Sequence, residues 1–232
     1  TMYRRTVLDN GLVVLTASMP HTYSVSITAF VGAGSRYESD QLAGTSHFLE
    51  HMVFKGTRLW PTAQSISEAI EGTGGIMNAG TEREMTVYWA KVARPYFNRA
   101  LSVIMDMLLA PLLDPSEMEK ERKVILEELA MTNDYPTHRV ALLIDETMWP
   151  NHPMGRDIGG TKESVSALTR QDLVDYMKVQ YTPGNVVVSA AGNISHEDMV
   201  EEIARMVKDW RPASPLTWQP VLDGQVSPRL TL

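Results

Sequence analysis

The chain has 232 residues, of which 44% are hydrophobic and 21% charged, a balance typical of a folded globular protein. The net charge of −7 gives no basic surface for nucleic acid, and no run of about 18 apolar residues predicts a membrane span. The absence of cysteine excludes disulfides, and it leaves histidine and carboxylate side chains as the ligands for any zinc ion.

No targeting segment is visible at the start of the sequence. Neither an apolar signal-peptide core nor an amphipathic leader rich in Arg and Ser precedes the first expected strand. The absence of cysteine is also typical of a reducing compartment. We therefore expect a cytoplasmic location.

The first part of the chain predicts three strands. Apolar residues on both sides of Asn10-Gly11 predict a hairpin over residues 4–17, because Asn-Gly favours the tight turns of hairpins. Residues 24–31 alternate between polar and apolar side chains, as a half-buried strand does. A glycine-rich loop that begins at residue 32 then ends this strand.

A buried helix is expected over residues 43–54. At about 100° per residue, His47, Glu50 and His51 fall on one stripe, and the helix is apolar nearly all round otherwise, with Phe48, Leu49, Met52 and Val53. Burying these polar groups without partners costs about 1–3 kcal/mol for each, and a metal ion removes that cost. Two histidines at i and i+4 can bind one ion, and the glutamate beside them can act as a base. A hydrogen-bonded core cluster is the alternative interpretation.

Helices and strands alternate in the rest of the chain. We expect strands over residues 76–81, 85–92 and 185–191, and helices over residues 63–71, 94–109, 115–131, 138–148, 170–179 and from Ser195 onward. This order favours an α+β fold, in which helices pack on a mixed or antiparallel sheet. Because prolines are frequent after Trp210, we expect one domain over residues 1–211 and a Pro-rich linker over residues 212–232.

The two histidines leave the metal site incomplete, because a catalytic zinc ion usually takes three protein ligands. The expected helix over residues 115–131 carries five glutamates, most of which we expect on a solvated face. Glu121 and Glu128 differ from the others because they lie two turns apart, within about 20° on one face. One of them can bind the metal, and the other can orient a ligand imidazole.

Residues 47–57, which read HFLEHMVFKGT, resemble the inverted zinc motif of the M16 metallopeptidases. That family includes pitrilysin, insulin-degrading enzyme and mitochondrial processing peptidase. The resemblance runs in the family's order from about residue 5 to residue 210. Further matches lie at residues 32–36, 78–81, 86–88, 121–128, 155–156, 160–161, 181–185 and 192–193. The combination is highly specific.

The resemblance implies a role for each residue of the predicted site. It makes His47, His51 and Glu128 the ligands of one zinc ion. It makes Glu50 the general base and Glu121 an assisting acid beside the ligands. The helical spacing pairs the same two glutamates without reference to the family.

The resemblance also implies that Asn78, Ala79, Gly80 and Thr81 bind a peptide substrate as an added β-strand. Backbone hydrogen bonds to such a strand give affinity with a loose sequence preference. Gly80 and Glu82 depart from the family pattern, since a larger residue and a Ser or Asp are commoner there. Glycine weakens a strand edge, so the subsite preference at this point stays open.

The function implied by the resemblance is that of a zinc metalloendopeptidase. M16 enzymes close two homologous halves around a chamber like a clam-shell, and this sequence contains the metal-bearing half. We therefore expect a second M16-like half, beyond residue 232 or on a separate subunit, and poor cleavage by this chain alone.

Two other functions stay open at this stage. The first is a non-catalytic M16-like scaffold or core subunit of a larger complex, although the five intact site positions argue against it. The second is a zinc-stabilised binding module, for which the remaining histidines show no suitable spacing.

Overall fold

The structure is a computed structural model and describes residues 3–222 and 224–231. Within these residues, six strands form one sheet: β1 (Arg4–Val7), β2 (Val13–Ser18), β3 (Ser24–Val31), β4 (Ile76–Thr81), β5 (Thr86–Ala93) and β6 (Val186–Gly192). Their order across the sheet is β1-β2-β6-β3-β5-β4. Strands β2 and β6 are parallel, whereas the other neighbours are antiparallel. The predicted α+β class with a mixed sheet is confirmed.

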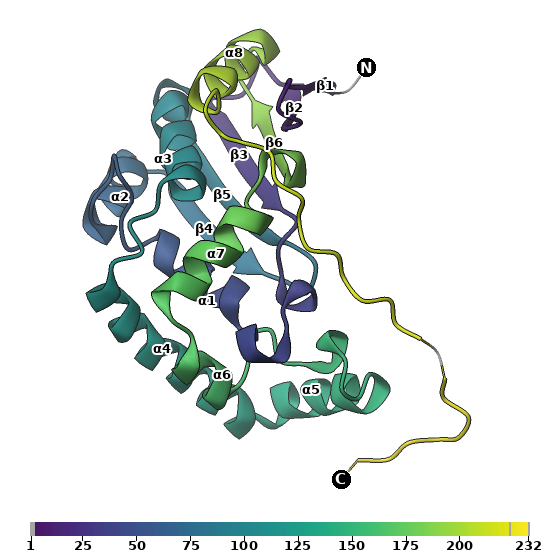
Figure 1. Cartoon of the computed structure of the whole chain (residues 1–232). Helices are drawn as coiled ribbons and strands as arrows, with labels where there is room; N and C mark the ends of the chain where they lie inside the picture. Colours follow the sequence, from purple (N-terminus) through teal and green to yellow (C-terminus); the bar gives the residue numbers. More distant parts are fainter. Residues whose placement is uncertain (1–2, 223, 232) are drawn as a thin grey trace.

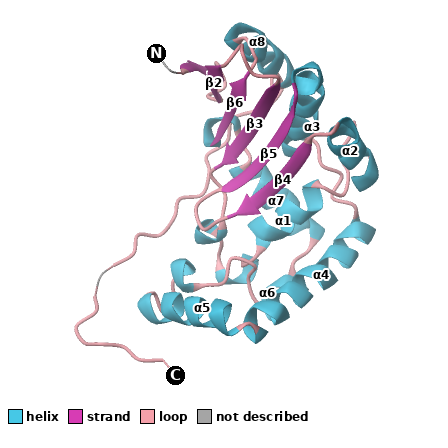
Figure 2. Ribbon diagram, turned by 180° about the vertical axis from the view of Figure 1, so that it is seen from behind, coloured by secondary structure: helices cyan, strands magenta, loops and turns pink. Residues whose placement is uncertain are grey.

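The helices surround one end and one face of this sheet. They are α1 (Thr45–Val53), α2 (Ala63–Ile70), α3 (Phe97–Leu109), α4 (Pro115–Asp134), α5 (Pro136–Met148), α6 (Lys162–Ala167), α7 (Arg170–Gln180) and α8 (His196–Met206). Figures 1 and 2 show α3 and α8 beside the strands, and α4, α6 and α5 in a row at the opposite end. None of the helices in the described residues combines the length and apolar character that a membrane crossing needs. A cytoplasmic location stays a prediction.

The core lies between one face of the sheet and the helices other than α5, which buries none of its residues. Along β3, alternate residues from Val25 to Val31 are buried, and the residues between them are at least partly exposed. Helix α3 packs on β3 and β5 and buries most of its own apolar side chains against them. The period of two in the sequence therefore separates the core face of the sheet from its outer face.

Most expected elements are present with small changes at their ends, and one helix was not expected. The sequence predicts no helix between residues 148 and 170, whereas the structure has the short helix α6 there. Thr161 caps α6, and Ser164 completes the capping box. Ser at that position is a weaker signal than the usual Glu or Gln, and six residues are too few to show a helical period.

The chain after α8 runs along the body of the domain towards α5, as the yellow trace in Figure 1 shows. The described residues after Trp210 form no helix or strand. Ala213 donates its backbone N–H to Thr182 Oγ1 at 2.7 Å. The guanidinium group of Arg36 stacks on the Trp218 ring, 4.0 Å from its centre. The division into a domain and a linker stays a prediction.

Candidate metal centre

Helix α1 presents its polar stripe to α4. Its apolar side chains are buried in the core, whereas His47, Glu50 and His51 are half-buried. Helices α1 and α4 pack against each other, and β4 lies on a further side of α1. The prediction of a buried helix with one polar stripe is therefore confirmed.

The start of α1 is held by residues from two loops. Gly44 offers no capping side chain, and Glu38 replaces it by accepting the backbone N–H groups of Gly44 and Ser46 at 2.8 and 2.7 Å. Gly44 adopts a φ of 91°, and a Cβ atom there would lie 2.4 Å from the carbonyl oxygen of Gly159. Glycine therefore allows the loop before α6 to pack directly on the helix that carries the motif.

Three side chains from α1 and α4 meet at one point. His47 Nε2 and His51 Nε2 lie 3.7 and 3.6 Å from Glu128 Oε2, which is too long for hydrogen bonds. Ligand atoms at about 2.1 Å from a tetrahedral zinc ion lie roughly 3.4 Å apart, so this spacing fits ligands around one ion. One ligand atom from each residue lies within 4.8 Å of the other two. This group could hold one metal ion.

Glu121 contacts a histidine of this group from the side away from Glu128. Its Oε2 lies 3.0 Å from His51 Nδ1, and Lys55 Nζ lies 2.7 Å from its Oε1. Burial opposes ionisation of Glu121, but hydrogen bonds from Lys55 and His51 outweigh it and lower the pKa of the carboxyl group. A carboxylate at Nδ1 orients the imidazole so that Nε2 points at the metal position.

His47 has a different environment. Its Nδ1 is buried and forms no hydrogen bond within the described residues. Burial lowers the pKa of His47, and the neighbouring His51 lowers it further. A neutral imidazole is the form that binds a metal, so this environment suits a ligand.

Glu50 lies on the side of α1 that faces β4. Its Oε2 accepts a hydrogen bond from Thr81 Oγ1 at 2.5 Å. Both residues line a pocket of about 350 Å³ together with His47 and Glu128. The predicted base and two of the three possible metal ligands therefore open into the same cavity.

The predicted peptide-binding residues form β4 at the edge of the sheet, beside this pocket. Within the described residues β4 pairs with β5 alone, so its other edge is free to accept a strand. Asn78 Oδ1 accepts the backbone N–H of Ala79 at 2.9 Å. A Cβ atom at Gly80 would meet nothing within 4 Å, so no close approach requires glycine there.

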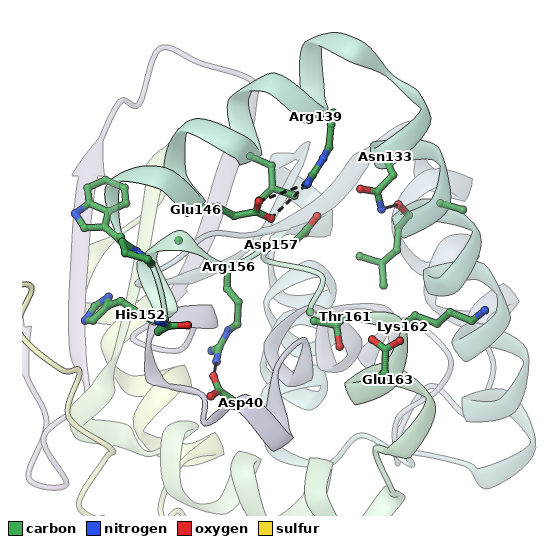
Figure 3. Close-up of a pocket in the computed structure, with 18 of the residues that line it drawn as sticks. Asp40, Asn133, Arg139, Glu146, His152, Arg156, Asp157, Thr161, Lys162 and Glu163 are labelled. Atoms are coloured by element: carbon green, nitrogen blue, oxygen red, sulfur yellow. Dashed lines mark hydrogen bonds and ion pairs between the residues drawn. The ribbon is translucent and has the colours of Figure 1, made fainter. Parts of the chain in front are cut away.

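A larger cavity of about 1010 Å³ adjoins the metal centre and shares Leu129 and Asp157 with the smaller pocket. It is bordered by α4, α5 and the loop before α6. Figure 3 shows the ion pair of Arg139 with Glu146 on its wall. Glu127, next to the predicted ligand in the sequence, lines this larger cavity and not the smaller pocket.

Two contact residues of the centre are not predicted from the sequence. In the sequence, Lys55 before Gly56 indicates only the end of the helix expected over residues 43–54, whereas its ammonium group contacts Glu121 in the structure. Its spacing of four residues from His51 is the signal that could have revealed it, because such residues share a helix face. Glu38 lies in a loop, where no periodic pattern marks a residue that will contact a helix end.

The fold and the site define the class of protein. Two histidines on one helix, a glutamate on another and a free strand edge beside them are features of zinc-dependent peptidases. The sequence model of insulinase, peptidase family M16, matches residues 13–162, and that of the M16 inactive domain matches residues 167–229. The chain belongs to the M16 family, as the motifs predict.

Curated relatives carry names of the same kind. A protein of Mycobacterium tuberculosis named as an uncharacterized zinc protease is 39% identical over 236 residues, which are 99% of this chain and 53% of the relative. An Arabidopsis thaliana protein named as a probable mitochondrial-processing peptidase subunit beta is 39% identical over 203 residues, which are 88% of this chain and 38% of the relative. The chain therefore spans about half the length of the curated relatives that it matches, and a smaller share of the Arabidopsis protein. The zinc protease name of the Mycobacterium relative and the His-His-Glu group agree with the predicted zinc cofactor.

Solved structures show the same fold. A protease from Helicobacter pylori matches with a TM-score of 0.86 at 22% identity, over 94% of this chain and 52% of that one. A peptidase from Alicyclobacillus acidocaldarius described as M16-like matches with a TM-score of 0.81 at 25% identity, over 93% and 51%. This chain therefore corresponds to about half of each neighbour.

Proposed function

We propose that this chain is the metal-bearing domain of a zinc metalloendopeptidase that cleaves peptides bound as extended strands. The observation that carries the proposal is the approach of His47 Nε2 and His51 Nε2 to Glu128, with Glu50 and the free edge of β4 on the same side. The zinc protease names of the relatives support the same reaction.

The residues of this chain fit separate tasks in peptide hydrolysis. A bound zinc ion would supply Lewis acidity toward the scissile carbonyl group and would lower the pKa of a water molecule to about 7. Glu50 would take a proton from the attacking water and pass it to the leaving amine. Glu121 would keep the His51 ring in its orientation through Nδ1. The peptide backbone would pair with β4, which aligns the scissile bond with the base.

A second M16-like half is part of the proposal. The chain covers 53% of the Mycobacterium relative and 52% of the Helicobacter structure, so those proteins contain a further part of similar length. The pocket at the metal centre is lined here by α1, α4, β4 and one loop. A second half would close this pocket against water, and we expect this chain alone to cleave peptides poorly.

Replacement of the proposed base tests the function. We expect Glu50→Gln to keep its zinc and to lose about 10²–10⁴-fold in peptide cleavage, because the amide cannot take a proton. The measurement is cleavage of a fluorogenic peptide library by the zinc-loaded protein, joined with its second half, beside its metal content.

Glu127→Gln is the matched control, because its side chain lines the larger cavity and should change neither quantity. Wild-type cleavage by Glu50→Gln would contradict the proposed base. Zinc binding without any cleavage by the two-half protein would favour a non-catalytic M16-like scaffold instead.

A further inference from the structure

Thr81 makes a contact that peptide binding does not use. Its hydroxyl group, at the end of β4, donates to Glu50 Oε2 in the second half of α1. Both side chains are half-buried, and the described residues provide no second hydrogen-bond donor to this carboxylate. The orientation of the Glu50 carboxylate therefore depends on a residue from the sheet.

The direction of the Thr81 side chain follows from the period of the strand. Along β4, Met77, Ala79 and Thr81 are half-buried, whereas Asn78 and Gly80 are exposed. Alternate side chains of a strand point to opposite faces, so Thr81 lies on the face that packs on α1. A peptide at the free edge would bond to the β4 backbone, which leaves the Thr81 hydroxyl for Glu50.

The neighbours of Thr81 hold it in place. It pairs across the hairpin with Thr86, whose buried hydroxyl donates to the carbonyl oxygen of Ala33 at 2.9 Å. In the turn that follows, Arg83 donates to Asp145 at 2.5 Å. Because these neighbours hold Thr81 in place, its hydroxyl group can fix the rotamer of Glu50, as supporting residues do in active sites.

We propose that Thr81 is a positioning residue that orients the Glu50 carboxylate for proton transfer. Its hydroxyl occupies Oε2, and Oε1 is left to take the proton. Because Thr81 also belongs to the strand on which the peptide is aligned, one element fixes both the base and the scissile bond. This inference rests on the proposed function, in which Glu50 is the base.

Kinetics separate positioning from peptide binding. Thr81→Val keeps the shape of the side chain and removes the hydroxyl group. We expect kcat to fall about tenfold or more, because a base misplaced by about 1 Å can cost up to 10²-fold. We expect KM to stay within about twofold, because the peptide contacts the backbone of β4 rather than this hydroxyl group.

Two further variants make this kinetic test specific. Thr81→Ser retains the hydroxyl and should recover most of the loss in kcat. Thr28→Val makes the same chemical change on β3, on the sheet face away from the core, and should behave as the wild type. An unchanged kcat in Thr81→Val, or a change in KM alone, would overturn the proposal.

A second measurement does not need turnover. In the metal-free chain, thermal unfolding is compared for wild type, Thr81→Val, Glu50→Ala and the double variant. A direct contact predicts that the double variant loses less in Tm than the two single losses together. If the Tm losses of the two single variants add up in the double variant, the proposal is overturned, whatever the rate of peptide cleavage. Coupled losses in a protein that cleaves no peptide would support the contact and contradict the proposed function instead.

Discussion

At the scale of single residues, the two histidines proposed as zinc ligands differ in what holds their second ring nitrogen. His51 Nδ1 contacts Glu121, whereas His47 Nδ1 is buried without a hydrogen bond in the described part of the chain. A carboxylate behind a ligand imidazole fixes the ring and raises its basicity. Glu121 should therefore act on the metal through His51, without binding the metal itself.

This role predicts a partial effect on zinc affinity. We expect Glu121→Ala to weaken zinc binding by about 10–100-fold, because the His51 ring loses its orienting partner. Competition with a chelator of known affinity measures the change, and Glu127→Ala on the same helix is the control. Complete loss of the metal would make Glu121 a ligand, and an unchanged affinity would remove it from the site.

The predictability of these residues depends on whether the contact is local. His47, Glu50 and His51 share a stripe of one helix, and Glu121 and Glu128 share a face of another, so the helical period predicts both sets. The contact of Thr81 with Glu50 joins residues 31 positions apart, on a strand and a helix. Local patterns carry no information on such a pair, because it forms only when β4 packs on α1.

At the scale of the elements, a histidine joins the last helix to the far edge of the sheet. His196, the first residue of α8, contacts Thr6 Oγ1 of β1 at 2.8 Å and Thr16 Oγ1 of β2 at 2.7 Å. Burial lowers the pKa of His196, the positive charge of Arg4 lowers it further, and Glu197 opposes the shift. The unfolded chain therefore takes up the proton more readily than the folded domain does.

This contact predicts how stability depends on pH. The contribution of His196 is complete above its unfolded pKa of about 6.5, and it is lost as the pH falls towards the lower pKa of the folded state. We expect the wild type to lose more stability between pH 7.5 and about pH 5 than His196→Gln does. Urea unfolding at each pH measures the difference, with the exposed His21→Gln as the control. An equal loss of stability in wild type and His196→Gln would contradict this role of His196.

The elements themselves were predictable where their pattern was long enough. Strand β3 alternates over eight residues and α3 carries an apolar stripe over 13, so both show their period clearly. Helix α6 has six residues, and its Thr161 cap uses Ser164 rather than an acidic partner. The order of the strands in the sheet was not predictable, because the parallel pairing of β2 with β6 joins the two ends of the domain.

At the scale of the whole molecule, the smaller cavity lies between the end of β4 and the candidate metal centre, and the larger cavity adjoins the smaller one. The cavities share Leu129 and Asp157, and the smaller one reaches Thr81 at the end of β4. We therefore expect a peptide on that edge to lie close to the proposed base. The relatives contain further sequence beyond the part that matches this chain. We expect a second half of this kind to cover the cavity and so to complete the site.

The zinc content of the purified chain shows whether His47, His51 and Glu128 together bind a metal ion. It is measured for the folded wild type, His51→Ala and Glu128→Gln, prepared without chelators and compared for the retention of fold. We expect one zinc ion per wild-type chain and its loss in both variants, because each variant removes one of three proposed ligands. A folded wild-type chain without zinc, or variants that retain the full zinc content, would contradict this ligand set.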